Sequence, residues 1–313
     1  MRCWRNPAAD LHVVPAGMPE TPERMAWALE AIAAGGWDCA LPPAEALATI
    51  DLPEAAATVH TDHRLKRLEE AAIPWRAKID TPDCPVSPGT PEAARLSLAT
   101  TLFALESAGP GREAALALVR PPGHHATPRM AMGFCYLNNI AVAARAAQRE
   151  GRRRVAILDF DVHHGNGTQE VFYREEEVFF CSLHEDPRVQ YPGTGFAEER
   201  GEGPGEGKTL NLPLESGTAG GEYLRAFEES ALPALAAHRP EILLVSAGFD
   251  SHRTDPLGGL ALRGEDFRTM GSRLAAWAVP LGLPVLFVLE GGYSRAGFTD
   301  GLRPFFEGWE AGA

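Results

Sequence analysis

Short, unbroken apolar runs separated by longer stretches of helical periodicity constrain the fold of this chain most strongly. An apolar run without alternation is typical of a strand that is covered on both faces, as in a parallel sheet between helices. Six such runs occur, at residues 115–119, 155–158, 178–180, 210–214, 242–245 and 285–289. We therefore predict an α/β fold with three layers, α/β/α.

The segments between these runs carry helix signals. Thr21 and Thr90 each precede a proline and an amphipathic stretch rich in Ala and Leu, a pattern in which the hydroxyl caps the helix. Similar patterns predict helices at residues 138–149, 220–237 and 265–279. The Pro- and Gly-rich segments 81–90 and 201–207 are expected to be loops. Because composition does not shift between the two halves, we expect a single domain over residues 1–313.

Composition limits the classes of partner. The 29 basic and 42 acidic side chains give a net charge of -13, which disfavours nucleic acid and would tolerate or attract cationic substrates. No apolar run approaches the ~20 residues of a membrane span, and the N-terminus lacks the apolar core of a signal peptide. We expect a cytoplasmic protein without a membrane partner; a homo-oligomer stays possible.

The cysteines carry little signal. They are odd in number, scattered, and contain no CxxC pair, so they indicate neither a disulfide framework nor a thiolate metal site. The five are Cys3, Cys39, Cys84, Cys135 and Cys181. A reducing compartment fits this pattern best.

Polar residues lie just beyond the C-terminal ends of four of the apolar runs. In open α/β sheets the ligand crevice lies outside the carboxyl ends of the strands, so these four clusters are predicted to meet at one site. The polar residues concerned are His124, His125, Asp159, Asp161, His163, Asp250 and Tyr293.

A metal site is the chemistry that these residue types suggest. In an extended strand Asp159, Asp161 and His163 would point to the same face, although a polar loop can have the same letters. Asp161, His163 and Asp250 form an Asp2His set that leaves coordination positions for water and substrate, as in catalytic zinc sites. Two carboxylates neutralise a dication, so the bound water should be weakly acidified and should need a separate base.

The adjacent histidines His124 and His125 can supply that base. One imidazole can deprotonate the water while its neighbour supports the developing charge, although paired histidines are also found as hydrogen-bonded core residues. Tyr293 offers a phenol that could donate to an oxyanion, whereas an amphipathic rim tyrosine is the simpler interpretation of that residue alone. Together these groups indicate attack of a metal-activated water on a carbonyl.

Five blocks of sequence carry a family resemblance. They are RPPGHHA (residues 120–126), GFCYLNN (133–139), DFDVHHGNGTQ (159–169), SAGFD (246–250) and EGGY (290–293). In this order, between about Pro22 and Tyr293, they resemble the signature motifs of the zinc-dependent histone deacetylase family, which includes bacterial acetylpolyamine amidohydrolases and deacetylase-like amidohydrolases. The resemblance implies the arginase/deacetylase fold, one domain with an eight-stranded parallel sheet.

The resemblance also implies roles for the polar residues. Asp161, His163 and Asp250 are similar to the zinc ligands of the family, with iron(II) as a possible replacement for zinc. His125 is similar to the general base and acid, and His124 to its electrostatic partner.

Three further positions match the catalytic machinery. Tyr293 resembles the donor to the tetrahedral oxyanion, and Asp159 the carboxylate behind His124. Asn166 stands where some members have a second aspartate, a pattern similar to class II enzymes. An amide should raise the pKa of His125 less than a carboxylate would, which keeps His125 unprotonated at neutral pH.

Potassium is a second ion that the family binds, next to the zinc. The residues that match its inner site are Asp159, Ser182 and Leu183, with the backbone oxygens of Asp161 and His163. An outer site would involve Phe172 and Val178.

The resemblance extends to a tunnel for the acyl-lysine side chain. Its matching residues are Gly133, Phe134 and Tyr191 in the walls, Leu257 at the rim, Asp83 as the rim aspartate that holds the substrate backbone, and Arg24 on an acetate exit. Tyr191 could instead be an ordinary core residue, Asp83 a turn residue, and Arg24 an exposed helix arginine.

The leading hypothesis is therefore a deacetylase that cleaves acetyl-lysine or a related acylated amine. An acetylpolyamine amidohydrolase is the alternative within the family, but Leu257 stands where polyamine-selective members are understood to have a glutamate. An arginase-like enzyme with two manganese ions needs more acidic ligands than Asp250 and Asp255 supply. A non-catalytic binding protein would be expected to have lost Tyr293 or a histidine.

Overall fold

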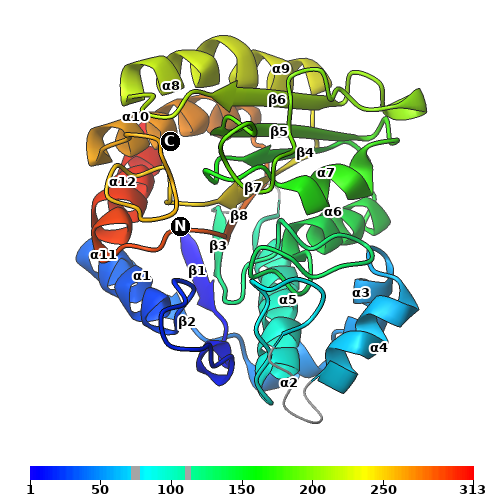
Figure 1. Cartoon of the computed structure of the whole chain (residues 1–313). Helices are drawn as coiled ribbons and strands as arrows, with labels where there is room; N and C mark the ends of the chain where they lie inside the picture. Colours follow the sequence, from blue (N-terminus) through cyan, green and yellow to red (C-terminus); the bar gives the residue numbers. More distant parts are fainter. Residues whose placement is uncertain (72–77, 110–113) are drawn as a thin grey trace.

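A parallel sheet of eight strands organises the computed structural model, which describes residues 1–71, 78–109 and 114–313. The strands are β1 (Arg2–Arg5), β2 (Cys39–Ala40), β3 (Ala115–Leu118), β4 (Val155–Asp159), β5 (Val178–Glu185), β6 (Thr209–Leu214), β7 (Ile242–Ala247) and β8 (Val285–Leu289). Their order is β2-β1-β3-β8-β7-β4-β5-β6 (Figure 1). The six predicted strands are confirmed; β1 and β2 were not predicted because they are short and lack an apolar run.

Helices fill most of the crossovers between the parallel strands, and the last two follow the final strand. They are α1 (Glu23–Ala34), α2 (Ala44–Ala48), α3 (Leu52–Ala57), α4 (Asp62–Ala71), α5 (Thr90–Ser107), α6 (Asn139–Arg149), α7 (Asn166–Phe172), α8 (Gly220–Ala226), α9 (Leu232–His238), α10 (Gly264–Ala278), α11 (Arg295–Gly297) and α12 (Arg303–Gly312). In the described part of the chain, none of them combines the length and the apolar character that crossing a membrane requires.

The two faces of the sheet are covered by different helices, which confirms the three-layer prediction. Figure 1 shows α1, α8, α10 and α12 on one side and α5 and α6 on the other. In β8, Phe287 and Leu289 belong to the core beneath the first set, whereas Leu286 and Val288 belong to the core beneath the second. Both sides of each central strand are therefore buried, which is why these strands are unbroken apolar runs.

Helix starts follow the predictions only in part. Asn138 caps α6 as its type suggests, because its side chain accepts a hydrogen bond from the Ala141 N–H at 3.0 Å. The capping prediction for Thr21 and Thr90 is wrong. The first turn of α1 begins after Pro22, and α5 begins at Thr90 itself, whose hydroxyl accepts from the Ser87 N–H instead. The predicted helix 220–237 is interrupted by a π-helical segment, Phe227–Ala231.

One disulfide contradicts the expectation drawn from the cysteines. Cys3 and Cys39 are register partners on β1 and β2, with their Cα atoms 4.5 Å apart, and they are bonded to each other. They are 36 residues apart in sequence, so only the pairing of the two strands brings them together. Cys84, Cys135 and Cys181 are free and buried. The cysteine argument for a reducing compartment therefore no longer holds.

The topology also decides where polar strand ends meet. The four strands that precede the predicted polar clusters, β3, β8, β7 and β4, are consecutive in the sheet and parallel. Their carboxyl ends therefore lie along one edge, which confirms that the four clusters converge.

Candidate active site

Asp161, His163 and Asp250 form a buried group in which one ligand atom from each lies within 4.8 Å of the others. The Nδ1 atom of His163 lies 2.9 Å from Asp161 Oδ1 and 3.2 Å from Asp250 Oδ2. Asp250 Oδ2 is buried and, within residues 1–71, 78–109 and 114–313, has no hydrogen-bond partner. Two buried carboxylates beside one imidazole fit a divalent cation, which would neutralise their charge.

Backbone hydrogen bonds orient these carboxylates. Asp250 Oδ1 accepts from the Val162 N–H at 2.9 Å, and Asp161 Oδ2 accepts from the Gly291 N–H at 2.7 Å. A Cβ atom at Gly291 would lie 2.0 Å from Asp250 Oδ2, so only glycine permits this approach.

Asp159 does not share the metal group, contrary to the simple strand argument. Strand β4 ends at Asp159, and beyond it each aspartate accepts the backbone N–H two residues later: Asp161 N donates to Asp159 Oδ1 at 3.2 Å, and His163 N to Asp161 Oδ1 at 2.9 Å. Such side-chain turns curl the chain, so the alternation of an extended strand no longer applies. Asp159 faces His124 instead.

The two adjacent histidines lie beside the metal group, each with its own partner. His124 Nδ1 is 3.0 Å from Asp159 Oδ2, and His125 Nδ1 is 2.7 Å from Asn166 Oδ1. The two imidazole centroids are 4.0 Å apart, and that of His125 is 5.9 Å from that of His163.

Their surroundings shift the pKa values of the two histidines in opposite directions. Burial alone would lower the pKa of His124, but Asp159, Asp161 and Glu290 raise it well above its ordinary value. Burial, His124 and His163 lower the pKa of His125 well below its ordinary value. These opposite directions favour a charged imidazolium at His124 and a neutral imidazole at His125. The hydrogen bond to Asn166 raises the pKa of His125 and is outweighed by burial and the two other imidazoles.

Tyr293 and Arg24 are in contact with each other. The Arg24 guanidinium carbon stands 4.8 Å from the Tyr293 ring centroid, and Arg24 Nε donates to the Gly292 carbonyl at 2.6 Å. Arg24 is fully buried and paired with Glu20 at 2.8 Å, so the alternative of an exposed helix arginine is wrong. Arg24 thus holds the Gly292–Tyr293 segment through the Gly292 carbonyl and the Tyr293 ring.

A tight turn carries two of the expected tunnel residues. Gly133 and Phe134 both have positive φ, 56° and 66°. A Cβ at Gly133 would lie 2.2 Å from His125 Cδ2, so a larger residue would displace the imidazole. Asp83 Oδ2 accepts from the Gly133 N–H at 2.9 Å, and the Phe134 ring lies 5.7 Å from that of Tyr293. Asp83 therefore anchors this turn.

Tyr191 and Leu257 are linked through Gln190. Tyr191 is 38% exposed and its ring lies 5.1 Å from that of His125, so it is not an ordinary core residue. Gln190, which precedes it, donates to the Leu257 carbonyl at 2.9 Å. Burial and Asp83 raise the pKa of Tyr191 above its usual range.

The residues expected to hold potassium lie on neighbouring elements. Asp159 and Ser182 are register partners on β4 and β5, and Leu183 follows Ser182. Phe172 ends α7 and Val178 begins β5. The Ser182 hydroxyl is also hydrogen bonded to His184 at 2.8 Å.

Comparison with known proteins decides the family. A family model of the histone deacetylase domain matches residues 18–308. The chain belongs to the histone deacetylase family.

Two curated relatives and a crystal structure illustrate the similarity. Acetylpolyamine amidohydrolase 1 of Pseudomonas aeruginosa is 43% identical over 74% of this chain and 66% of its own length. Histone deacetylase 10, chloroplastic, of Oryza sativa subsp. japonica is 41% identical over 81% of this chain and 56% of its own. The chain thus spans less than two thirds of either relative. The crystal structure of acetylpolyamine aminohydrolase from Burkholderia pseudomallei superposes with a TM-score of 0.88 and 34% identity, covering 100% of this chain and 99% of that one.

Metal uptake by this histone deacetylase family member should depend on pH. Burial opposes protonation of His163, but the hydrogen bond to Asp161 and the nearby Asp250 carboxylate outweigh it and raise the pKa of His163 to about 10. Burial also raises the pKa of Asp250 to about 7. An incoming ion therefore displaces at least one proton, so the apparent affinity for Zn²⁺ should rise by about tenfold or more per pH unit between about pH 6 and 8. Competition with a chromophoric chelator measures this slope.

The matched variants are His163→Gln, which should weaken binding and remove this proton, and His63→Gln, an exposed histidine whose loss should change nothing. A wild-type affinity that does not vary with pH would contradict the assignment of His163 as a ligand.

Proposed function

We propose that this chain is a metal-dependent amidohydrolase that removes acetyl groups from acetyl-lysine or a related acylated amine. The observation that carries the proposal is the imidazole of His125, whose centroid lies 5.9 Å from that of His163, beside the buried Asp161, His163 and Asp250 group. Its surroundings lower the pKa of His125, which favours the neutral form. Metal-dependent amide hydrolysis needs this combination of an ion site and a separate base. The names of the relatives, acetylpolyamine amidohydrolase and histone deacetylase, support the same reaction class.

Asp161, His163 and Asp250 would hold the metal, which we propose to be zinc, with iron(II) as the alternative. A bound dication would polarise the amide carbonyl and acidify a water molecule. Potassium at Asp159, Ser182 and Leu183, with a second ion near Phe172 and Val178, would balance the charge of the buried carboxylates. We also propose that residues 1–313 form one domain, which the match over residues 18–308 supports.

Each catalytic side chain would have a separate task. His125 donates its Nδ1–H to Asn166, which leaves Nε2 free to take a proton from water and later give it to the leaving amine. His124, charged and paired with Asp159, would stabilise the negative charge that develops next to it. The Tyr293 hydroxyl would donate to the oxygen of the tetrahedral adduct.

The tunnel residues would orient the substrate. Gly133, Phe134 and Tyr191 would line the acyl-amine chain, with Leu257 at the rim. Asp83 would hold a substrate backbone through Oδ1, a buried oxygen that has no hydrogen-bond partner among the described residues, while Oδ2 anchors Gly133. Arg24 would lie on the path by which acetate leaves.

The arginase-like alternative has little support. Asp255, which would be needed as a ligand of a second metal, accepts hydrogen bonds from the Tyr293 N–H at 2.7 Å and the Leu257 N–H at 3.0 Å. Its carboxylate therefore shapes the rim. The non-catalytic alternative has no support either, because Tyr293 and both histidines are retained.

A turnover assay on a fluorogenic acetyl-lysine peptide tests the proposal. We expect activity that a chelator abolishes and added Zn²⁺ restores, and we expect Asp161→Ala to lose both bound metal and turnover because it removes one of three protein ligands. The control is Asp10→Ala, at an exposed aspartate distant in sequence from the site. Full metal occupancy in Asp161→Ala would disprove the ligand assignment.

Tyr293→Phe should keep the metal and lower kcat roughly 10²- to 10³-fold, because it removes a donor to the oxyanion while leaving the ring in place. Metal analysis and steady-state kinetics measure the two effects. Tyr173→Phe, at the end of α7, serves as the control. If kcat of Tyr293→Phe equalled that of the wild type, Tyr293 would have no part in the reaction.

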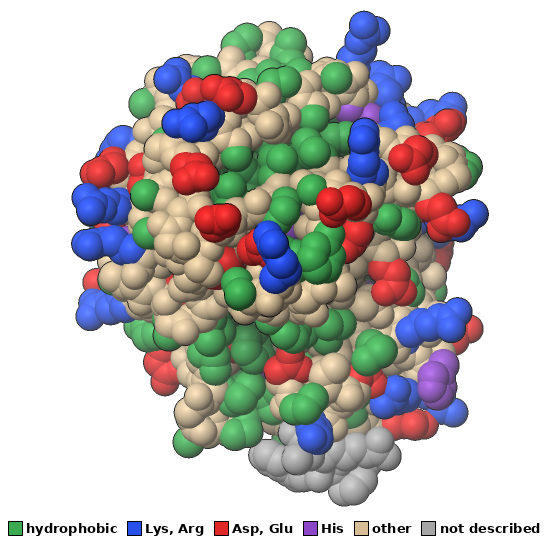
Figure 2. Space-filling model, turned by 45° about the horizontal axis from the view of Figure 1, so that its top comes forward, with side chains coloured by type: hydrophobic (Ala, Val, Ile, Leu, Met, Phe, Trp, Pro, Cys, Tyr) green, Lys and Arg blue, Asp and Glu red, His purple; other side chains and the backbone are tan. Residues whose placement is uncertain are grey.

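Substrate choice is predicted from the rim. Leu257 offers no charge to a distant ammonium group, so acetyl-lysine peptides should have a higher kcat/KM than N8-acetylspermidine. The net charge of -13 could attract any polycation. However, acidic and basic side chains are interspersed on the face in Figure 2, and such attraction is screened over about 8 to 10 Å at physiological salt.

Measuring kcat/KM for both substrates decides between them. Leu257→Glu should raise the value for the acetylpolyamine, whereas Leu257→Gln, of the same size but uncharged, should not. A wild-type preference for the acetylpolyamine would make the interpretation of Leu257 wrong and favour the second candidate, an acetylpolyamine amidohydrolase.

A further inference from the structure

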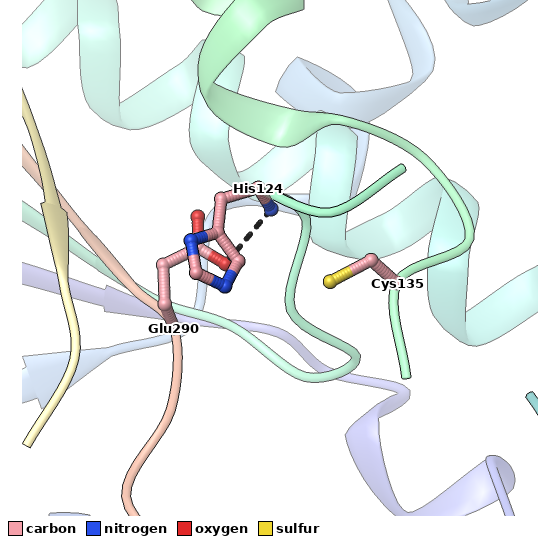
Figure 3. A group of neighbouring side chains, drawn as sticks. All are labelled: His124, Cys135 and Glu290. Atoms are coloured by element: carbon pink, nitrogen blue, oxygen red, sulfur yellow. Dashed lines mark hydrogen bonds between the residues drawn. The ribbon is translucent and has the colours of Figure 1, made fainter. Parts of the chain in front are cut away.

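Glu290 is a fully buried carboxyl group next to the backbone of His124, and it has no part in the proposed reaction. Its Oε2 accepts hydrogen bonds from the Gly123 N–H at 2.7 Å and the His124 N–H at 3.1 Å, and Figure 3 shows the latter. Its Oε1 accepts from the Ser246 hydroxyl at 3.3 Å. The sequence drew attention to the EGGY block only for its tyrosine, so this glutamate was missed.

Glu290, His124 and Cys135 could geometrically hold an ion, since one ligand atom from each lies within 4.8 Å of the others. Their polar atoms already have partners, however. Cys135 Sγ donates to the Gly133 carbonyl at 3.2 Å, His124 Nδ1 is paired with Asp159, and Glu290 accepts three hydrogen bonds. The arrangement is that of an internal anchor rather than a second metal centre.

We propose that Glu290 is a positioning residue: its two hydrogen bonds to the Gly123 and His124 backbone fix the His124–His125 loop against the Asp161, His163 and Asp250 group. This inference rests on the proposed amidohydrolase function.

The sheet itself cannot hold this loop. The last register pair between β3 and β8 is Ala117 with Val288, so the ladder ends before the loop that carries the histidines begins. Glu290 follows β8 immediately. Its carboxylate connects the segment after β8 to the segment after β3, beyond the last backbone pair of the two strands.

The same segment is tied to the rest of the site. The Glu290 carbonyl accepts from Arg24 Nη2 at 2.5 Å, and the next N–H, that of Gly291, donates to Asp161 Oδ2 at 2.7 Å. One short stretch of chain therefore connects the histidine loop, a candidate metal ligand and Tyr293.

An acceptor, rather than a charge, is what the geometry requires. Burial raises the pKa of Glu290 to about 7, although His124 and the Gly123 N–H act against that rise. Both protonation states leave an oxygen lone pair for the two N–H groups. Glutamine keeps an oxygen at this place, whereas leucine leaves two buried N–H groups without an acceptor.

The test compares variants of the metal-loaded enzyme by kcat, KM and metal content. We expect Glu290→Gln to stay within about fivefold of the wild-type kcat, and Glu290→Leu to lose about 10²-fold in kcat, since a shift of the histidine loop of about 1 Å misaligns the base. KM and metal stoichiometry should change little in both. The control Ser246→Ala removes the partner of the other oxygen and should leave kcat within about twofold.

If Glu290→Leu does not fold, Glu290→Asp carries the test: the shorter side chain withdraws the acceptor, and kcat should fall at least about tenfold with an unchanged KM. Unchanged kcat in the folded Leu or Asp variant would overturn the proposal. So would a Gln variant as impaired as Leu, or the loss of one metal equivalent from Glu290→Gln. A wild-type protein without turnover would instead refute the amidohydrolase function itself.

Discussion

Burial of carboxylates around imidazoles is the constraint on which the site depends. Asp159, Asp161, Asp250 and Glu290 are all fully buried, and a buried charge is tolerated only when it is paired or hydrogen bonded. The protein meets this requirement by giving each carboxylate backbone N–H donors, imidazoles or both. These partners come from different strand ends. The contacts that stabilise each buried carboxylate therefore also hold the neighbouring strand ends in place.

This arrangement separates two histidines that are adjacent in sequence. His124 faces carboxylates, which raise its pKa, whereas His125 faces an amide, Asn166, and two other imidazoles, and its pKa is lowered. Both residues are histidines, so their pKa values differ only because their surroundings differ. The pKa of each follows from which of its neighbouring groups are charged.

Support for the site comes from a second layer of buried polar contacts. Glu20 pairs with both Arg24 and Arg120, and Arg120 also donates to the backbone carbonyls of Ala9 and His12. One of these arginines then holds the Gly292–Tyr293 segment, and the other begins the loop that leads to His124. The N-terminal segment and α1, which contribute no proposed metal ligand, are in this way part of the structure that keeps the site in place.

The sequence by itself determined the layered α/β class, six of the eight strands and the convergence of the polar clusters, because unbroken apolar runs and the polarity of parallel strand ends are local properties. The short motifs that resemble the family also pointed to Asp161, His163, Asp250, His124 and His125, which the structure brings close together. Only the tertiary structure decided the rest. It paired the short strands β1 and β2 through Cys3 and Cys39, turned Asp159 toward His124, and placed Glu290 and Arg24 against the segments that carry His124 and Tyr293. These features depend on contacts between residues far apart in the chain, and a buried glutamate or arginine has no signal in sequence that distinguishes it from an exposed one.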